Sequence, residues 1–476
     1  MWRLCRVHLR SFHCFHSESR NSPPGRYILI ISGHIDVSFC LFAPDARFHS
    51  PLLVRLASEH FHFETGSDVK RVVVVGGGIV GLSTAWFLRQ KGAEVTVLER
   101  KEVGSGASWG NAGWVSPAFS VPLAEPAALK LGVSTFFSRT SPVSVPLRAD
   151  VNLLQFLAGF VRNCRADVWE AGLRALSPLN VQALAAYREI ERGGVMHGPA
   201  RMDPGLIFAP DTQRLASLEH ELAAVRGSGQ EVDFDVLSGD EARKLAPMVA
   251  AGMKAAVRLN DQYYLDPRPF IQSLAARLSD LGVVIEEGVS VLDVDSEASP
   301  VVRTDDGPRS ADAVVMANGA WLAGFRKKLG VRQVVQAGRG YSFSVKPATM
   351  PDGPLYFPSH RVVATPMDGS LRVSGMMEFR HPDAPLDRRR LEAVVRTIQP
   401  LLPSIDFSQR SEEWVGSRPC TADGLPLIGQ SKIPGVYVAG GYGMWGLTLG
   451  PAGGRLLADQ MTGAPDPVAA PFNPLR

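Results

Sequence analysis

Three glycines that follow an apolar run have the spacing of a dinucleotide-binding turn. Gly76, Gly78 and Gly81 form G-x-G-x-x-G directly after Arg71–Val75. In this pattern the first glycine permits a tight turn, the second lets a pyrophosphate approach the backbone, and the third lets a helix pack closely on a strand. Glu99 follows at about the 20-residue distance where an acidic side chain meets a ribose hydroxyl. Because this residue is acidic rather than basic, the sequence favours FAD or NAD over a cofactor with a phosphorylated ribose.

The same glycine pattern occurs again near the C-terminus. Gly441, Gly443 and Gly446 lie between a predicted strand and a predicted helix. A second nucleotide-binding unit cannot follow, because only a short proline-rich tail remains after Met461. We therefore interpret this stretch as a glycine loop and a helix N-terminus directed at negative charge on the cofactor already bound. A reduced flavin carries such charge near N1 and the C2 oxygen, whereas a nicotinamide does not, so the pattern favours FAD over NAD.

Two further stretches of small residues are candidates for cofactor contact. Gly104–Pro117 follows the acidic residue and includes Ser108 and Asn111. Alone it would be an ordinary glycine and serine loop, but its nearness to the first motif favours contact with the cofactor through backbone N–H groups and these two side chains. Ala317 and Gly319 end another apolar strand, where a second crossing of the chain near a dinucleotide is expected.

Alternating and helical apolar periods predict the elements that position these motifs. They predict helices over Ile79–Lys91, Asp150–Asn163, Pro178–Arg192, Thr212–Arg226, Ser238–Ala246 and Arg268–Leu281. They predict strands over Arg71–Val75, Glu94–Leu98, Gly205–Pro210, Val283–Glu286, Val289–Asp295, Val301–Thr304 and Ala311–Met316. The order strand, helix, strand around the first motif indicates an α/β fold.

Length and composition favour a soluble enzyme of two domains. The chain has 476 residues and a formal net charge of +3, too small a charge to suggest a nucleic-acid partner. No apolar run approaches the ~20 residues that span a bilayer. After residue 68 the cysteines are Cys164 and Cys420, which indicates a reducing compartment and no disulfide framework. We expect a cytoplasmic protein, and peripheral contact with the inner face of a membrane stays open.

The first 68 residues differ in composition from the rest of the chain. They hold seven of the eleven histidines and three of the five cysteines, without a lysine. The spacings of Cys5, His8, His13, Cys14 and His16 match no zinc pattern, so no metal site is predicted. A transit peptide is one interpretation. A segment that is not part of the natural protein is the other, and in both we expect residues 1–68 to be disordered.

With these motifs in hand, the chain resembles the FAD-dependent D-amino-acid oxidase superfamily. It is most similar to the small-subunit type of bacterial D-amino-acid dehydrogenase, with glycine oxidase next. The resemblance covers roughly residues 69–461. The matching stretches are VVVVGGGIVGLSTAW, LER at Leu98–Arg100, NAGWVSP at Asn111–Pro117, LRVSGMMEF at Leu371–Phe379, GSRPCTADGLPLIG at Gly416–Gly429 and GGYGMWGLTLGPAGGRLLAD.

The resemblance implies a Rossmann-like FAD-binding domain and a discontinuous substrate domain built on a mostly antiparallel sheet. We assign 69–147, 261–321 and 411–465 to the first, 148–260 and 322–410 to the second, and 466–476 to a tail. Cys420 lies too close to Asp423 for the pattern of relatives with covalent flavin, so we expect non-covalent FAD. The loop GYGMWG lacks the histidine that related chains carry after the second glycine.

The resemblance also implies the roles of site residues. Arg418, in the family's G-x-R-P motif, is expected to bind the substrate carboxylate, as a guanidinium fork can do bidentately. Tyr356 and Arg361 are candidates for the lining of the substrate pocket. The predicted cofactor-binding residues are Gly76, Gly77, Gly78, Ile79, Val80, Gly81, Glu99, Arg100, Ser108, Asn111, Ala112, Val291, Ala317, Gly319, Gly441, Gly443, Leu447 and Thr448.

The function expected from the resemblance is oxidative deamination of D-amino acids to 2-oxo acids and ammonia, by hydride transfer from the α-carbon to flavin N5. The electron acceptor would be a quinone or oxygen. Three alternatives stay open. They are an oxidase of glycine, sarcosine or a secondary amine such as proline, a 2-hydroxy-acid dehydrogenase, and a non-catalytic subunit that holds FAD.

Overall fold

The computed structural model of the protein describes residues 71–126, 143–145, 150–296 and 298–476, and four strands among the first 42 residues. The chain divides into two units, Met1–Thr65 and Gly66–Arg476. The first unit contains an antiparallel sheet of β1 (Arg3–Leu4), β2 (Cys14–Ser17), β3 (Tyr27–Gly33) and β4 (Ile35–Phe42). Most of residues 1–68 lie outside the described residues, so the expected disorder of this segment stays a prediction.

The first large sheet of the second unit has the topology of a dinucleotide-binding domain. Its strands lie in the order β14-β6-β5-β18-β25-β24, and all neighbours are parallel except the pair β25 and β24. Parallel strands are covered on both faces, which is why the four valines of β5 are all buried. The bounds are β5 (Arg71–Val75), β6 (Glu94–Glu99), β14 (Val284–Glu287), β18 (Ala313–Met316), β24 (Leu427–Gln430) and β25 (Val436–Gly440).

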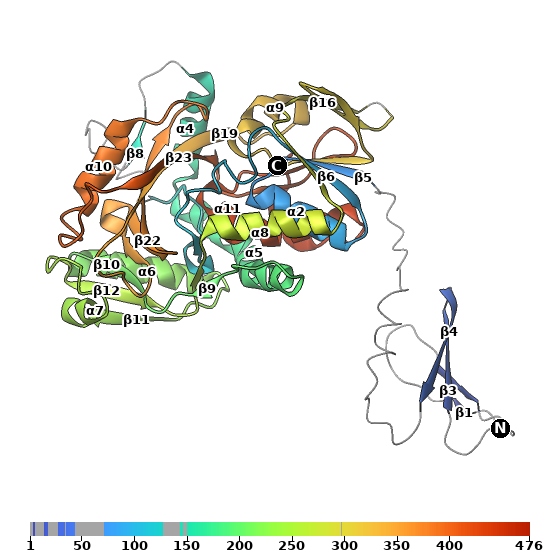
Figure 1. The fold of residues 1–476 in the computed structure, drawn as a ribbon, viewed down its shortest axis with the longest axis horizontal. Helices are drawn as coiled ribbons and strands as arrows, with labels where there is room; N and C mark the ends of the chain where they lie inside the picture. The colour runs from blue at the N-terminus through green and yellow to red at the C-terminus, as the bar shows by residue number, and fades with distance from the viewer. Residues whose placement is uncertain are drawn as a thin grey trace. The chain divides into compact units, whose positions relative to one another are not determined.

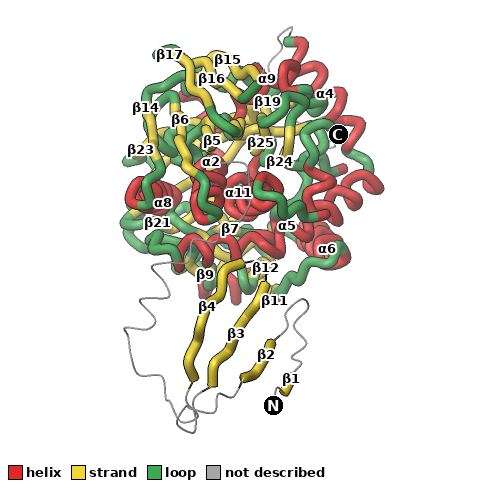
Figure 2. The backbone as a smooth tube through the Cα atoms, turned by 90° about the vertical axis from the view of Figure 1, so that its right-hand side faces the viewer, coloured by secondary structure: helices red, strands yellow, loops and turns green. Residues whose placement is uncertain are grey.

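Helices α2 (Ile79–Gln90), α5 (Ala166–Arg192) and α11 (Gly446–Met461) pack together beside this sheet, and α8 (Pro267–Asp280) contacts α2 (Figures 1 and 2). The α2–α11 contact is close because α11 presents glycines. A Cβ on Gly454 would lie 2.8 Å from the backbone nitrogen of Thr84. This pair of helices brings the two glycine motifs of the sequence to one region.

The second large sheet has nine strands and is mostly antiparallel. Its main path is β11-β12-β10-β20-β21-β22-β19-β23, with β8 beside β22, and parallel pairing occurs only at β10–β20 and β8–β22. The bounds are β8 (Val143–Ser144), β10 (Gly205–Ala209), β11 (Phe234–Ser238), β12 (Ala255–Leu259), β19 (Val335–Val345), β20 (Leu355–Phe357), β21 (Val362–Met367), β22 (Ser370–Phe379) and β23 (Ser411–Thr421). The two sheets confirm the predicted fold class.

Smaller elements complete the second unit. Two three-stranded sheets have the orders β7-β13-β9 and β15-β16-β17. Their bounds are β7 (Trp114–Val115), β13 (Tyr263–Tyr264), β9 (Ala200–Arg201), β15 (Val291–Ser296), β16 (Pro300–Thr304) and β17 (Gly307–Ser310). The remaining helices are α4 (Val151–Asn163), α6 (Thr212–Gly227), α7 (Gly239–Leu245), α9 (Leu322–Leu329) and α10 (Arg388–Ile398), with short 3-10 turns at Pro117–Phe119, Gly319–Trp321, Pro358–His360, Gly443–Trp445 and Pro467–Phe472. None of the helices described here is long and apolar enough to cross a bilayer.

Three segments differ from the boundaries expected from sequence. The helix expected to start at Pro178 begins at Ala166, because its buried apolar stripe continues through the proline. Residues 411–465 divide between the sheets, since β23 pairs with β19. The C-terminal residues are packed rather than a loose tail: Phe472 is buried, and the guanidinium of Arg476 pairs with Asp423 at 2.9 Å.

A buried ion cluster joins β19 and β22 of the nine-stranded sheet. Glu378 Oε2 lies 3.3 Å from Nη1 of Arg339 and accepts a 2.7 Å hydrogen bond from the Tyr341 hydroxyl. Its other oxygen lies 3.5 Å from Arg390 Nε and 4.0 Å from Arg380 Nη1. Both Arg339 and Glu378 are almost fully buried. Water therefore solvates these two charges little, and each depends on the other for compensation.

Glu378→Ala is expected to lower the free energy of unfolding by about 3–5 kcal/mol, because it leaves a buried guanidinium without its counter-charge. The matched control is Glu170→Ala, which breaks an exposed pair with Arg174 and should change stability by less than about 1 kcal/mol. Urea unfolding of both variants measures the difference. Equal stabilities would show that the buried cluster contributes nothing.

Candidate cofactor and substrate site

A single cavity of about 2480 Å³ runs between the two large sheets. Pockets for one drug-sized ligand typically measure about 300–1,000 Å³. The cavity is therefore large enough for an extended dinucleotide and a substrate together. Its wall contains residues from the first glycine turn, the Gly104–Pro117 stretch, the second glycine loop and strands of the nine-stranded sheet.

The first glycine turn is shaped as its sequence predicts. Gly76 has φ +112°, and a Cβ there would lie 2.6 Å from the carbonyl oxygen of Ala317 on the neighbouring strand. A Cβ on Gly81 would lie 1.9 Å from the carbonyl oxygen of Gly76. Gly78 is the residue before α2, and it has no side chain that could cap the helix. The first-turn N–H groups of α2 thus face the cavity, where a pyrophosphate would be stabilised.

Two polar side chains border this turn. The hydroxyl of Ser108 accepts a 3.1 Å hydrogen bond from the backbone N–H of Ile79. The carboxylate of Glu99 accepts hydrogen bonds from the N–H groups of Gly77 at 2.8 Å and Lys101 at 3.0 Å. Glu99 also lies on the cavity wall. It therefore holds the turn in shape while facing the place where a ribose is expected.

Arg100, directly after β6, connects the two large sheets. Its guanidinium lies 3.7 Å above the ring of Trp321 and 2.8 Å from a carboxylate oxygen of Asp383. The indole N–H of Trp321 donates to the same carboxylate at 2.8 Å. Arg339 also donates to the carbonyl oxygens of Ala384 and Pro385. These contacts hold the loop after β22 beside the cavity.

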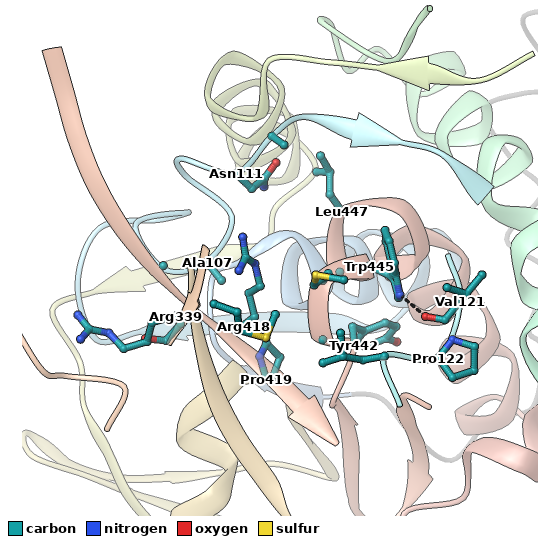
Figure 3. Close-up of a pocket in the computed structure, with 18 of the residues that line it drawn as sticks. Ala107, Asn111, Val121, Pro122, Arg339, Arg418, Pro419, Tyr442, Trp445 and Leu447 are labelled. Atoms are coloured by element: carbon teal, nitrogen blue, oxygen red, sulfur yellow. Dashed lines mark hydrogen bonds between the residues drawn. The ribbon is translucent and has the colours of Figure 1, made fainter. Parts of the chain in front are cut away.

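The second glycine loop forms another part of the cavity wall. Gly443 has φ +54° and lines the cavity with Leu447 in the first turn of α11. The indole N–H of Trp445 donates to the carbonyl oxygen of Val121 at 2.7 Å (Figure 3). Thr448 is turned away and donates to the carbonyl oxygen of Trp114 at 3.1 Å. The N-terminus of α11 thus points its backbone N–H groups toward the cavity, as expected for a site that stabilises negative charge.

The structure brings together most of the residues predicted for the site. Those in the cavity wall are Gly76, Gly78, Ile79, Val80, Glu99, Arg100, Ser108, Asn111, Ala112, Val291, Ala317, Gly319, Gly443, Leu447, Tyr356, Arg361 and Arg418. Gly77, Gly81, Gly441 and Thr448 are not in the wall. These four support its shape from behind: a Cβ on Gly441, for example, would lie 2.7 Å from the side chain of Thr421. The first turn, the small-residue loop and the α11 N-terminus fit the FAD that the sequence implies.

Arg418 presents a guanidinium to the cavity from β23. In Figure 3 its side chain points from the strand toward the loop that carries Ala107 and Asn111, with Trp445 and Leu447 farther along the same space. Among the described residues, its hydrogen-bond partner is the carbonyl oxygen of Met376 at 3.2 Å, and none of their carboxylates lies within 4 Å of it. Burial lowers the pKa of this guanidinium. A carboxylate ligand would compensate the charge.

Glycines make room for this arginine. Gly340 lies beside it on β19, and a Cβ there would be 2.1 Å from Nη2 of Arg418. Gly338, the pairing partner of Arg418 in the sheet, faces Cys420, whose sulfur would be 2.8 Å from a Cβ on Gly338. The guanidinium therefore lies flat against the backbone of a neighbouring strand, which limits the directions it can take.

Tyr356 and Arg361 lie in a second polar region of the cavity wall. Arg361 donates to Glu125 with an Nη2–Oε1 distance of 3.0 Å. The ring of Tyr356 packs edge to face with Trp114 and Phe119, at centroid distances of 5.7 and 5.9 Å. Arg361 is thus already paired with a carboxylate, unlike Arg418. It is therefore not a second group that could bind a substrate carboxylate in the same way.

Sequence reasoning missed several residues of this region. Glu125, Glu221, Trp114, Phe119 and Trp445 all line the cavity. One of them could have been found from its spacing. Glu221 lies three residues after Leu218 and four before Val225, both buried on α6. A carboxylate inside an apolar helical stripe indicates a buried polar site. Glu125 is brought to the cavity by tertiary structure alone.

Cys420 is buried beside the site. It is 1% exposed, and burial raises the pKa of its thiol to about 12. The thiol is therefore protonated at neutral pH, and only the thiolate is an effective nucleophile. This environment agrees with the expectation of non-covalent flavin.

The sequence and the fold are similar to those of known FAD-dependent enzymes. A family model described as DAO, FAD dependent oxidoreductase, matches residues 71–460. The fold is similar to that of glycine oxidase from Geobacillus kaustophilus, with a TM-score of 0.66, 23% identity, and coverage of 86% of this chain and 99% of that one. It is also similar to L-proline dehydrogenase from P. horikoshii, with a TM-score of 0.64, 18% identity and coverage of 86% and 98%. FAD-bound L-alpha-glycerophosphate oxidase from Mycoplasma pneumoniae gives a TM-score of 0.65 at 18% identity and coverage of 86% and 98%.

Gly81→Ala is expected to reduce the flavin content of the purified protein severalfold, because the added methyl group collides with the Gly76 carbonyl and must move α2 away from β5. Such overpacking also lowers the free energy of unfolding by roughly 1–3 kcal/mol. Gly252→Ala is the matched control, since a Cβ there meets no atom within 4 Å. The ratio of absorbance at ~450 nm to protein absorbance measures flavin content. Full retention in Gly81→Ala would contradict the role given to this turn.

Acid precipitation is expected to release all of the flavin into the supernatant, because the buried Cys420 thiol is protonated at neutral pH. Cys420→Ser should contain as much flavin as the natural protein. The measurement is flavin fluorescence in the supernatant and the pellet. Flavin that stays with the precipitated natural protein, but not with the variant, would identify Cys420 as a covalent attachment site.

Proposed function

Because this chain belongs to the DAO family of FAD-dependent oxidoreductases, we propose that it deaminates D-amino acids oxidatively to 2-oxo acids and ammonia. The observation that carries the proposal is Arg418, a cation in the cavity wall with no carboxylate partner among the described residues. A 2-amino acid supplies the missing carboxylate and places its α-carbon beside the cofactor.

Arg418 binds and orients the substrate. A guanidinium holds a carboxylate with two parallel N–H···O bonds, which fix both the position and the plane of that group. The backbone of Gly340 packs against the guanidinium and restricts its rotation. With the carboxylate fixed, the directions of the α-hydrogen and the amino group are restricted too. Orienting the substrate in this way lowers the entropic part of the activation barrier.

The bound FAD supplies the acceptor for the hydride that leaves the α-carbon. The N–H groups at the start of α11 face the cavity and favour negative charge there. The resulting imino acid takes up water and releases ammonia, which leaves the 2-oxo acid. The reaction requires no side-chain base at the α-carbon, because the substrate reacts as the neutral amine and loses the α-hydrogen as hydride.

The proposal extends to the setting of the enzyme. FAD is held without a covalent bond, the substrate is a small amino acid, and electrons pass to a quinone or to oxygen. The protein acts in the cytoplasm or at the inner face of the membrane. The glycine oxidase and proline dehydrogenase names of the similar structures make glycine and secondary amines the first competitors of D-amino acids.

Anaerobic bleaching of the flavin band at ~450 nm tests the substrate class. D-amino acids are expected to bleach it, whereas L-amino acids are not, since a carboxylate fixed on Arg418 directs the α-hydrogen of one enantiomer toward the cofactor. Glycine and sarcosine lack a side chain, proline is a secondary amine and D-lactate lacks the amino group, so we expect none of these four to bleach the band. The rate of reoxidation in air then separates an oxidase from a dehydrogenase. Bleaching by glycine or sarcosine alone would replace the proposal by an amine oxidase. No bleaching by any compound would favour a non-catalytic role.

Arg418→Ala is expected to raise the KM for the bleaching amino acid by about 30-fold to 4,000-fold, the range for loss of one partner of a buried, hydrogen-bonded charge pair. FAD should remain bound, because the variant removes no group from the glycine turns. Arg174→Ala is the control, an exposed arginine elsewhere on the cavity wall. Steady-state kinetics measure both variants, and an unchanged KM in Arg418→Ala would remove the proposed anchor.

A further inference from the structure

The cavity has a polar end that is separate from Arg418. It is formed by Tyr356 on β20, Arg361 after β20, Glu221 on α6 and Glu125. Glu125 and Arg361 form an ion pair at 3.0 Å. The carboxylate of Glu221 lies near both and accepts no hydrogen bond from the described residues. One cation therefore faces two carboxylates.

Strand register places this end on the same face of the sheet as Arg418. Tyr356 pairs with Val363, which continues through Ser374 and Ser342 to Trp414 on β23. Arg418 lies four residues after Trp414, so both side chains project from the same face. At Arg361 this end comes closer to Arg418. A Cβ on Gly375 of β22 would lie 3.2 Å from the carbonyl oxygen of Arg361, and Nη1 of Arg418 donates to the carbonyl oxygen of the next residue, Met376, at 3.2 Å. Arg361 and Arg418 therefore lie on either side of the same part of β22, so an amino acid with a long side chain can extend from one toward the other.

The two ends carry opposite charge. Burial, reinforced by the negative charge of Glu125 and opposed by Arg361, raises the pKa of Glu221 to about 7. Once Glu221 is ionised, the group of Glu125, Glu221 and Arg361 has a net charge of −1. On α5 and α6, the other ionisable side chains along the wall are Glu170, Arg174, Arg214 and His220. The charges that act on Glu221 are those of Glu125 and Arg361.

Aromatic rings cover part of the wall of the same cavity. Trp114, Phe119 and Tyr356 form a mutual cluster with centroid distances of 5.7–6.0 Å. Trp445 lines the cavity as well. Aromatic faces attract cations and pack against methylene chains. A wall of rings that leads to an excess carboxylate suits an aliphatic stem with a cationic end.

We propose that Glu221 determines substrate specificity and selects amino acids with a cationic side chain, whose carboxylate binds Arg418 and whose distal ammonium or guanidinium binds Glu221. This inference rests on the proposed function, because it takes an amino acid as the substrate. It adds the class of side chain, which neither the family nor the carboxylate anchor determines.

Anaerobic flavin reduction of the holoenzyme by arginine and citrulline tests the inference. The two have nearly the same shape, but citrulline is neutral, and both enantiomers of each are used. At pH 8 the second-order rate constant for flavin reduction should be at least tenfold greater for arginine than for citrulline. Glu221→Gln should bring the two within about threefold, since glutamine keeps the shape and removes the charge.

Glu219→Gln is the matched control. It lies two residues away on α6, outside the cavity wall, and should keep the preference of the natural enzyme. Flavin content and melting temperature verify that both variants fold. Equal rates for arginine and citrulline with the natural enzyme would overturn the inference and leave the proposed function intact. Faster reduction by glutamate than by glutamine would also overturn it, with Arg361 as the recognition group. Reduction by no amino acid at all would instead overturn the proposed function.

The pH dependence gives an independent readout. Because Glu221 ionises near pH 7 in the free enzyme, the preference for arginine over citrulline should rise about tenfold between pH 6 and pH 8. The guanidinium of arginine stays charged throughout this range, and citrulline corrects for titration of the α-amino group. The rise should be absent in Glu221→Gln. A ratio that is constant with pH in the natural enzyme would contradict a role for this carboxylate.

Discussion

A guanidinium held in a sheet without a carboxylate is the interaction on which the site depends. Burying an isolated charge is unfavourable, and other arginines packed into the nine-stranded sheet have acidic partners. Arg339 pairs with Glu378 and Arg372 with Glu412, each at 3.3 Å. Arg418 has a carbonyl oxygen at 3.2 Å. This charge has no carboxylate partner among the described residues and is therefore available to a ligand.

The two sheets contribute differently to the site. The parallel sheet supplies backbone: glycines that admit close approach, and helix N-termini whose first-turn N–H groups lie at the cavity. The antiparallel sheet supplies side chains whose positions follow from register and alternation. Contacts between the sheets, such as Arg100 with Asp383 at 2.8 Å, keep these two sets at a constant separation. Under the proposed function, separate parts of one cavity wall therefore position the cofactor and the substrate.

Local patterns predicted much of this arrangement, and long-range pairing explains what they could not predict. The bounds of β5, α2 and β6 follow from apolar periodicity and glycine position, and the helix predicted over Ser238–Ala246 begins with a capping box formed by Ser238 and Glu241. The position of β23 in the antiparallel sheet depends on its pairing with β19, which local periodicity does not contain. The length of α5 was underestimated, because packing of its buried stripe outweighs the hydrogen bond lost at Pro178.

At the polar end of the cavity, too, one residue can be predicted from local sequence and the others depend on long-range contacts. Glu221 is visible in the sequence as an acid within the apolar stripe of α6, whereas its neighbours Glu125 and Arg361 are 236 residues apart. Only the folded chain shows that Arg361 pairs with Glu125, so that the charge of Glu221 has no cation of its own. The anchor on β23 and the carboxylate on α6 thus belong to different elements. Under the proposed specificity, substitutions on α6 therefore alter the choice of side chain while the groups that orient the α-carbon stay in place.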